Sequence, residues 1–211
     1  MTENDNKNIK IISDFLNEES IKYTMTIPAD DDTQAIFSVN GINGQPIEIR
    51  YVNSFTHKMD YTKRFGIKGI PHTYFISISH NNENNGIRTI WIKDFEIADC
   101  KTIKGMKDED VPNYHRKWEV LKSYIRTACG IIKHRFYARD CELREVPNSQ
   151  LRPFLNLNCF YGYRSANINL GLYLKKDKNG FKKDTLLYVY TFGSGFYSHN
   201  KPGLIEVIRV A

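Results

Sequence analysis

Residues 134–211, the last third of the chain, constrain its possible fold more than any other segment does. Four short runs there are typical of β-strands: 141–146, 166–174, 185–192 and 204–210. A helix is predicted between the first two runs, with its N-cap at Asn148 or Ser149 and its last turn at Leu155. We therefore expect a small sheet that is covered by helical segments.

Several motifs in this segment follow one another in a known order. They are His134–Val146, Gly171–Leu174, Tyr190–Gly193 and Ile205–Val210. This order resembles the module on the C-terminal side of many phage-encoded homing endonucleases, which looks like the first half of a GNAT-type acyltransferase fold. The resemblance implies a truncated, half GNAT-like antiparallel sheet with helices over residues 131–211.

The same resemblance bears on the cofactor. A GNAT-type fold holds its acyl carrier through backbone N–H groups of a glycine-rich loop that follows the fourth strand. The run 204–210 matches that strand, and only Ala211 follows it in the sequence. Coenzyme A is therefore not expected, unless the sequence is part of a longer chain. DNA targeting is what the resemblance implies in its place.

The N-terminal part, residues 1–130, has its own pattern and ends near the helix terminator Gly130. Apolar spacing, alternation and two Asn-Gly pairs within 40–44 predict helices and a hairpin. The predicted helices are 9–19 and 113–129, and the predicted strands are 21–27, 35–39, 46–52 and 88–92. We also expect helix and loop around Pro71, and either a turn or a helix end at Asn81–Gly86.

The order of hairpin, strand, helix and strand between residues 35 and 95 looks like a nuclease core. It is similar to the very-short-patch-repair branch of the PD-(D/E)XK fold, and Gly86–Phe95 is the better half of the match. The two resemblances together imply an α+β protein. Its first module, 1–130, is expected to be a PD-(D/E)XK-like mixed sheet with helices, and its second module the half GNAT-like sheet.

Phosphodiester hydrolysis in that fold needs a divalent ion held by carboxylates. The resemblance implies Mg²⁺ bound by Glu48 and by Asp32, or else by one of the two aspartates before Asp32, with His57 as a catalytic histidine. Arg50 stands where Lys or Asn is expected, and it stays protonated, so it can contact phosphate but cannot act as a base.

The match at the catalytic residues is incomplete, because the strand expected to carry the first aspartate, 35–39, has no carboxylate. Two hypotheses follow. The chain is either an Mg²⁺-dependent DNA endonuclease or a catalytically degenerate derivative that occupies DNA as a repressor or inhibitor. A third hypothesis is an antagonist of a host or phage protein, because basic patches also dock onto acidic protein surfaces.

The charge distribution points to a polyanionic partner. The net charge is +6, and Lys and Arg gather at 116–152 and at 175–183. We expect double-stranded DNA to lie in a trough formed by both modules, unless these cations are only solvated and the tyrosines only packed. The predicted contacts are Arg50, Arg116, Lys117, Lys122, Arg126, Lys133, Arg135, Arg139, Tyr163, Arg164, Lys175, Lys176, Lys182 and Lys183.

Localisation follows from what the sequence lacks. It has no apolar run near 18 residues and no signal-peptide pattern, so no membrane span is predicted. The four cysteines show no metal-ligand spacing, and we expect them to be reduced. These features predict a cytoplasmic protein, and the resemblance to phage homing endonucleases implies that its cytoplasm is that of an infected bacterial host.

Overall fold

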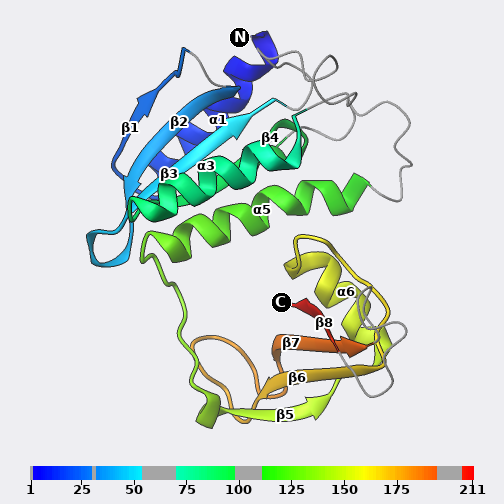
Figure 1. Ribbon diagram of the computed structural model, residues 1–211. Helices are drawn as coiled ribbons and strands as arrows, with labels where there is room; N and C mark the ends of the chain where they lie inside the picture. The colour runs from blue at the N-terminus through cyan, green and yellow to red at the C-terminus, as the bar shows by residue number, and fades with distance from the viewer. Residues whose placement is uncertain (1, 30–31, 54–69, 98–110, 194–205) are drawn as a thin grey trace. The chain divides into compact units, whose positions relative to one another are not determined.

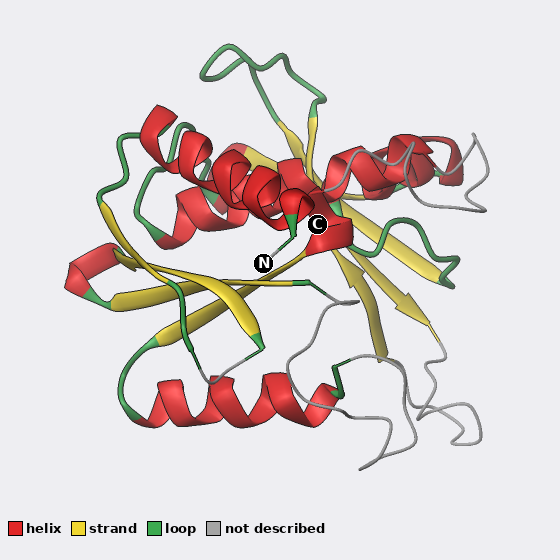
Figure 2. Ribbon diagram, turned by 90° about the horizontal axis from the view of Figure 1, so that it is seen from above, coloured by secondary structure: helices red, strands yellow, loops and turns green. Residues whose placement is uncertain are grey.

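The computed structural model describes residues 2–29, 32–53, 70–97, 111–193 and 206–211 (Figure 1). For 111–116, 206 and 209 only the backbone is described. The chain divides into two compact units, Met1–Ile131 (unit 1) and Ile132–Ala211 (unit 2). The chain combines helices and strands (Figure 2), and each unit contains both. The predicted α+β class is confirmed, with a mixed four-stranded sheet in unit 1 and an antiparallel four-stranded sheet in unit 2.

Unit 1 is built on a sheet with the strand order β1-β2-β3-β4. The first three strands pair antiparallel, and β4 pairs parallel with β3 after the helix α3. The elements are α1 Glu3–Glu18, β1 Tyr23–Thr26, β2 Thr33–Asn40, β3 Pro46–Val52, α3 His72–Asn84, β4 Arg88–Lys93, α4 Asp94–Ile97 and α5 Val111–Ala128.

The turn between β2 and β3 confirms the hairpin signal of the Asn-Gly pairs. A short 3-10 turn, Ile42–Gly44, joins the two strands. Asn43 and Gly44 both have positive φ there, 59° and 76°. Asn and Gly are the residues that adopt this left-handed conformation most readily.

One face of this sheet forms the apolar core of unit 1. Alternate residues of β3, among them Ile47 and Ile49, are buried on it with Phe37 of β2. The helix α1 contributes Ile12, Phe15 and Leu16, whose helical spacing places them on one side of the helix. The helix α5 joins the same core, because the ring of Phe15 meets Trp118 edge-on at 5.5 Å.

The other face of the sheet lies under α3 and is polar and aromatic. Trp91 of β4 donates from its indole N–H to Ser79 of α3 at 2.9 Å. The ring of Phe75, one of several aromatic residues there, stands edge-on to Trp91 with centroids 4.9 Å apart. Figure 1 shows α1 and α3 on opposite sides of the sheet.

The helix α1 begins at Glu3, six residues earlier than predicted. Thr2 and Asp5 form a reciprocal capping box, in which each side chain accepts from the other residue's backbone N–H. Two polar residues, Asp5 and Asn8, are buried in these first turns. Apolar periodicity cannot predict these first turns of the helix, because their buried side chains Asp5 and Asn8 are polar.

Unit 2 is an antiparallel sheet in sequence order, β5-β6-β7-β8, with one described helix of more than a single turn. The elements are β5 Cys141–Glu145, α6 Asn148–Asn158, β6 Ile168–Leu174, β7 Leu186–Gly193 and β8 Glu206–Val210. The strand predictions for this unit are confirmed to within a few residues.

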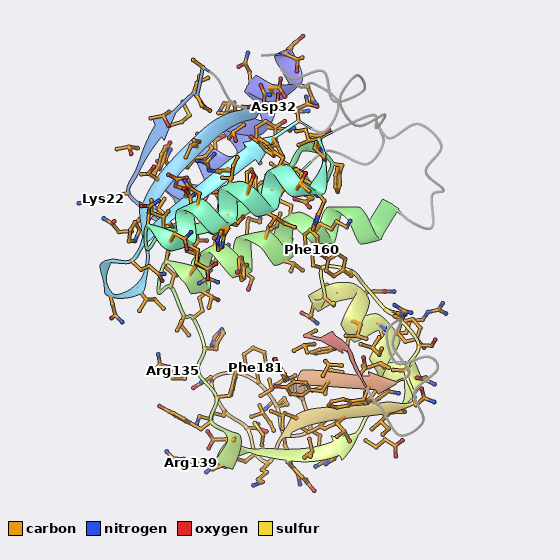
Figure 3. All side chains as sticks on the ribbon, in the orientation of Figure 1. Lys22, Asp32, Arg135, Arg139, Phe160 and Phe181 are labelled. Atoms are coloured by element: carbon orange, nitrogen blue, oxygen red, sulfur yellow. The ribbon has the colours of Figure 1, made fainter. Side chains whose placement is uncertain are left out.

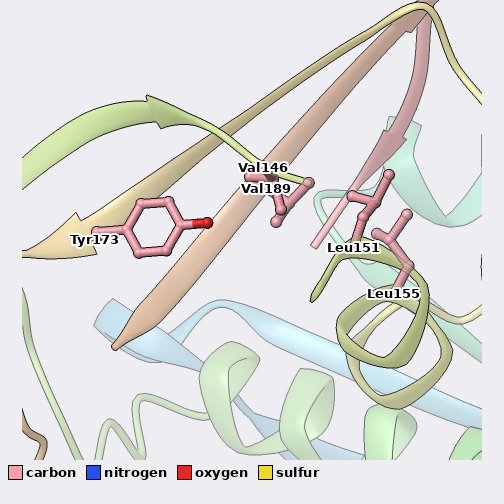
Figure 4. Packing of buried hydrophobic residues seen from close by; sticks show 5 residues of the cluster. All are labelled: Val146, Leu151, Leu155, Tyr173 and Val189. Carbon is pink, nitrogen blue, oxygen red and sulfur yellow. The ribbon is translucent and has the colours of Figure 1, made fainter. Parts of the chain in front are cut away.

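The core of unit 2 lies between α6 and one face of the sheet (Figure 4). It contains Leu151 and Leu155 of α6, Tyr173 of β6, Val189 of β7 and Val146 after β5. Gly171 is required at the centre, because a Cβ there would stand 2.5 Å from the Val146 side chain.

The predicted N-cap of α6 is wrong. Asn148 is already the first helical residue, and Pro147 takes the cap position without a side-chain hydrogen bond. Proline has a fixed φ that suits the entry to a helix. The backbone, not an Asn or Ser side chain, therefore sets where α6 begins.

Candidate nucleic-acid interface

Glu48, the first predicted metal ligand, is held in a polar network under α3. Its Oε2 accepts hydrogen bonds from Arg50 Nε and Asn82 Nδ2, both at 2.8 Å, and forms an ion pair with Arg50 Nη2 at 2.8 Å. Asn82 also reaches the hydroxyl of Thr89 on β4. The network links the middle of β3 to the last turn of α3.

Arg50 was predicted to contact DNA, but the structure buries it. Its exposed fraction is 8 %, and besides Glu48 it donates to the hydroxyl of Thr33 at 3.3 Å. Its guanidinium lies 5.8 Å from the centre of the Trp91 ring. Arg50 therefore neutralises Glu48 inside unit 1 and is not placed to meet a phosphate.

Asp32, the second predicted ligand, lies at the other end of the strands from Glu48. The register of β2 and β3 sets Glu48 opposite Ser38, and Asp32 stands six residues before Ser38. At about 3.3 Å per residue the two carboxylates are roughly 20 Å apart along the sheet. Lys22 and Glu48 line one cavity of about 390 Å³, so Lys22 marks the end of the sheet where Glu48 lies. Figure 3 shows Asp32 at the opposite end of the sheet from Lys22.

The residues around Glu48 do not fit Mg²⁺. A divalent ion needs carboxylate oxygens with free lone pairs, and a guanidinium 2.8 Å from Oε2 would repel it. The predicted Glu48–Asp32 metal pair is not formed in this register. Within the part of the chain that the structure describes, no group of three or more His, Cys, Asp or Glu could hold a metal ion. The alternative ligands Asp30 and Asp31, and the predicted catalytic residue His57, lie outside the described residues.

A second polar group, not predicted from the sequence, joins α1 to the end of β3. Asp5 Oδ1 accepts from Tyr51 Oη at 3.1 Å and from Asn53 Nδ2 at 2.8 Å, while Asn8 donates to Tyr51. Burial alone would raise the pKa of Asp5, but the hydrogen bonds from Thr2, Asn53 and Tyr51 outweigh it and lower the pKa. Asp5 is thus a fully bonded anion that ties the helix to the sheet.

Glu96 of α4 lies buried near Lys93 and Lys117, and burial raises its pKa to about 7. Its folded-state pKa exceeds its ordinary value of 4.5, so the folded protein binds the proton more tightly than the unfolded chain does. Unit 1 should therefore lose stability as the pH rises from about 4.5 to about 7, by up to about 3 kcal/mol.

Replacement of this carboxyl tests that pH dependence. Glu96→Gln should be more stable than wild type at pH 8, and the difference should shrink towards pH 5. Gln keeps an oxygen that can accept the Lys93 backbone N–H, which Glu96 accepts at 2.7 Å. Urea unfolding at both pH values measures the difference. An equal effect of the substitution at both pH values would contradict a raised pKa.

The described cations of α5, which were predicted to contact phosphate, make contacts within unit 1. Arg126 pairs with Glu19 at 2.7 Å and lies over the ring of Phe15. Lys122 pairs with Glu119. Lys117 Nζ lies 5.5 Å from the centre of the Phe95 ring. Arg126 and Lys117 thus connect α5 to other elements of unit 1, and the side chain of Arg116 lies outside the described residues.

In unit 2, two basic segments that are far apart in sequence lie side by side. Lys175 Nζ donates to the backbone oxygen of Arg139 at 3.2 Å, and Asn179 Nδ2 to that of Arg135 at 3.2 Å. Lys178 pairs with Asp140. The ring of Phe181 packs edge-on against His134 and Phe136. Figure 3 shows Arg135, Arg139 and Phe181 at the same end of unit 2.

These contacts gather seven exposed cations, which we name the basic cluster. Its members are Lys133, Arg135, Arg139, Lys175, Lys176, Lys182 and Lys183. Lys182 forms an exposed ion pair with Asp177, and exposed pairs contribute little stability. The cluster was predicted as two sequence runs, and the structure brings the runs to one end of one sheet.

The net positive charge of the chain also comes from unit 2. Unit 2 has thirteen Lys and Arg against six Asp and Glu, whereas unit 1 has seventeen against eighteen. With neutral histidines, unit 2 therefore carries +7 and unit 1 carries −1. A polyanion would be attracted to unit 2 and not to unit 1.

The two remaining predicted contacts differ in exposure. Arg164 is exposed. Tyr163 is half-buried against the core of unit 2, and the guanidinium of Arg152 lies 5.4 Å from its ring centre. Tyr163 therefore packs in the fold, and its ring is not open to a base.

Comparison with known proteins adds no relative. No family model matches the chain, and no match was found among curated proteins or solved structures.

Among the described residues, no helix combines the length and apolar character that crossing a membrane requires. Cys129, Cys141 and Cys159 are free thiols.

Proposed function

We propose that this protein binds duplex DNA through the basic cluster of unit 2. The observation that carries the proposal is the contact between the 175–183 hairpin and the 134–140 segment, which concentrates cations at one end of the sheet. Lys and Arg side chains that neutralise phosphates release condensed counterions, and this release drives most non-specific DNA binding.

Two further features support the proposal. The excess positive charge lies in unit 2, which is the part that resembles the DNA-targeting module of phage homing endonucleases. In unit 1, a hairpin, a crossover helix and a parallel fourth strand follow one another in the order on which the likeness to a PD-(D/E)XK core rests. Both likenesses stay proposals.

Of the two DNA-related hypotheses, we favour binding without cleavage at Glu48. The carboxylate of Glu48 is neutralised by Arg50 and also accepts a hydrogen bond from Asn82, so it is not available to hold Mg²⁺. Occupation of DNA, as by a repressor or an inhibitor, is then the proposed activity.

A gel-shift titration of the full chain with duplex DNA tests the proposal. If about five phosphates are neutralised, affinity should fall roughly 100- to 1,000-fold between ~50 mM and ~200 mM salt. Absence of a complex at the lower salt concentration would contradict the proposal. A salt-insensitive complex would also contradict it, because phosphate contacts would then not supply the binding energy.

A further inference from the structure

The face of the unit 2 sheet opposite α6 carries three aromatic rings in a row. Tyr188, Tyr190 and Phe192 are alternate residues of β7, so their side chains share one face, whereas Val189 points into the core. The ring centroids of Tyr188 and Tyr190 are 4.9 Å apart. Those of Tyr190 and Phe192 are 6.2 Å apart, and the two rings are nearly parallel, at 19°.

The strands beside this aromatic row continue the same surface. Leu172, Leu170 and Ile168 of β6 pair with the three aromatic residues. Leu143 of β5 and Val210 of β8 extend the face on either side. The exposed fractions are 59 % for Leu143, 40 % for Ile168, 39 % for Tyr190 and 41 % for Val210. Exposed apolar side chains that neighbour one another on a sheet face are typical of interaction sites.

Charge decides between the occupants that this face could take. Unit 2 carries thirteen Lys and Arg against six Asp and Glu, so two copies of it repel each other. The same excess attracts a partner that combines phosphates with flat, apolar rings. Nucleotide bases stack on aromatic side chains with little sequence preference, and this stacking is the basis of single-strand binding.

The basic cluster lies near the end of the sheet where the aromatic row begins, so its cations could bind the phosphates of a strand whose bases contact the row. The 175–183 hairpin joins the end of β6 to the start of β7, and Tyr188 follows Lys183 by five residues. Alternate residues along a strand are about 6.6 Å apart, roughly twice the 3.4 Å rise per nucleotide in one DNA strand. Glu145, at the β5 edge of the face, pairs with Leu170, away from the hairpin.

We infer that the aromatic row stacks unpaired bases, so that the DNA recognised by this protein includes a single-stranded segment. The inference rests on the proposed function, because the basic cluster supplies the phosphate contacts that bring the strand to the sheet. The cluster then holds duplex and single strand alike, and the aromatic row adds affinity for the single strand alone.

Fluorescence anisotropy of the full chain with a labelled oligothymidylate of about 12 nucleotides tests the inference, with a duplex of equal length in parallel. Tyr190→Ala should weaken single-strand binding roughly 5- to 100-fold and leave duplex binding unchanged. Tyr190→Phe keeps the ring and should bind like wild type. Leu143→Ala is the control on the same face. It removes an apolar side chain but no ring, so it should bind oligothymidylate like wild type.

Other outcomes overturn the inference in distinguishable ways. If Tyr190→Ala binds oligothymidylate as wild type does, stacking is excluded while duplex binding still supports the proposed function. If Tyr190→Ala or Leu143→Ala changes the oligomeric state in sedimentation, the face is a contact between copies. If wild type binds neither probe, the proposed function fails as well. Circular dichroism of Tyr190→Ala, compared with Tyr190→Phe, separates loss of a ring from loss of the fold.

Discussion

Glu48→Ala is expected to lower the free energy of unfolding of unit 1 by about 3 kcal/mol, because it leaves the buried Arg50 guanidinium without its carboxylate. Arg50 is 8 % exposed, so little water reaches it in the folded protein. Asn82 loses an acceptor at the same time. Thermal unfolding should show the midpoint of unit 1 falling by roughly 10 °C.

Glu83→Ala provides the matched control for Glu48→Ala. Glu83 follows Asn82 on α3 and is exposed, so its removal should shift the midpoint very little. An unchanged midpoint for Glu48→Ala would show that the Arg50 network does not stabilise the fold. Mg²⁺-dependent nicking of plasmid DNA by wild type that a folded Glu48→Ala protein lacks would restore Glu48 as a catalytic residue.

Removal of three lysines from the basic cluster should produce the largest loss of DNA affinity. Lys176→Gln, Lys182→Gln and Lys183→Gln together should weaken duplex binding roughly 10- to 100-fold at about 0.1 M salt. All three side chains are exposed, and Gln keeps their approximate length, so the fold should be retained. Gel-shift titration at fixed salt measures the loss.

An equal change of net charge elsewhere tests whether position matters. Lys7, Lys10 and Lys22 are exposed on unit 1, so the corresponding triple glutamine variant loses the same three charges. This control should retain near wild-type affinity. Similar losses in both variants would indicate that only total charge matters and that the basic cluster has no specific role.

Local sequence pattern predicted most of the fold. In α5, Leu121, Ile125 and Ala128 are buried as their spacing predicts, and α3 ends at Asn84 with Gly86 in the left-handed conformation. These features depend on neighbouring residues and on the period of one element. The family of each unit could not be decided in this way, since a fold class is compatible with many families.

The candidate site could be predicted only in part, because its geometry depends on long-range pairing. The cations of the basic cluster are visible in the sequence, but hydrogen bonds of Lys175 and Asn179 to a distant segment are not. The distance between Glu48 and Asp32 follows from the β2–β3 register. The sequence does not indicate that Asn82 bonds to Glu48 in the interior, because an Asn within a polar helix is ordinarily exposed.

The most direct measurement is the salt dependence of duplex binding for wild type and the two triple lysine variants. The logarithm of the association constant falls linearly with the logarithm of salt concentration, with a slope of about −0.9 per neutralised phosphate. The basic-cluster variant should have a slope smaller in magnitude by about two to three, and the unit 1 control should keep the wild-type slope. Equal slopes for wild type and the basic-cluster variant would contradict phosphate binding by these lysines.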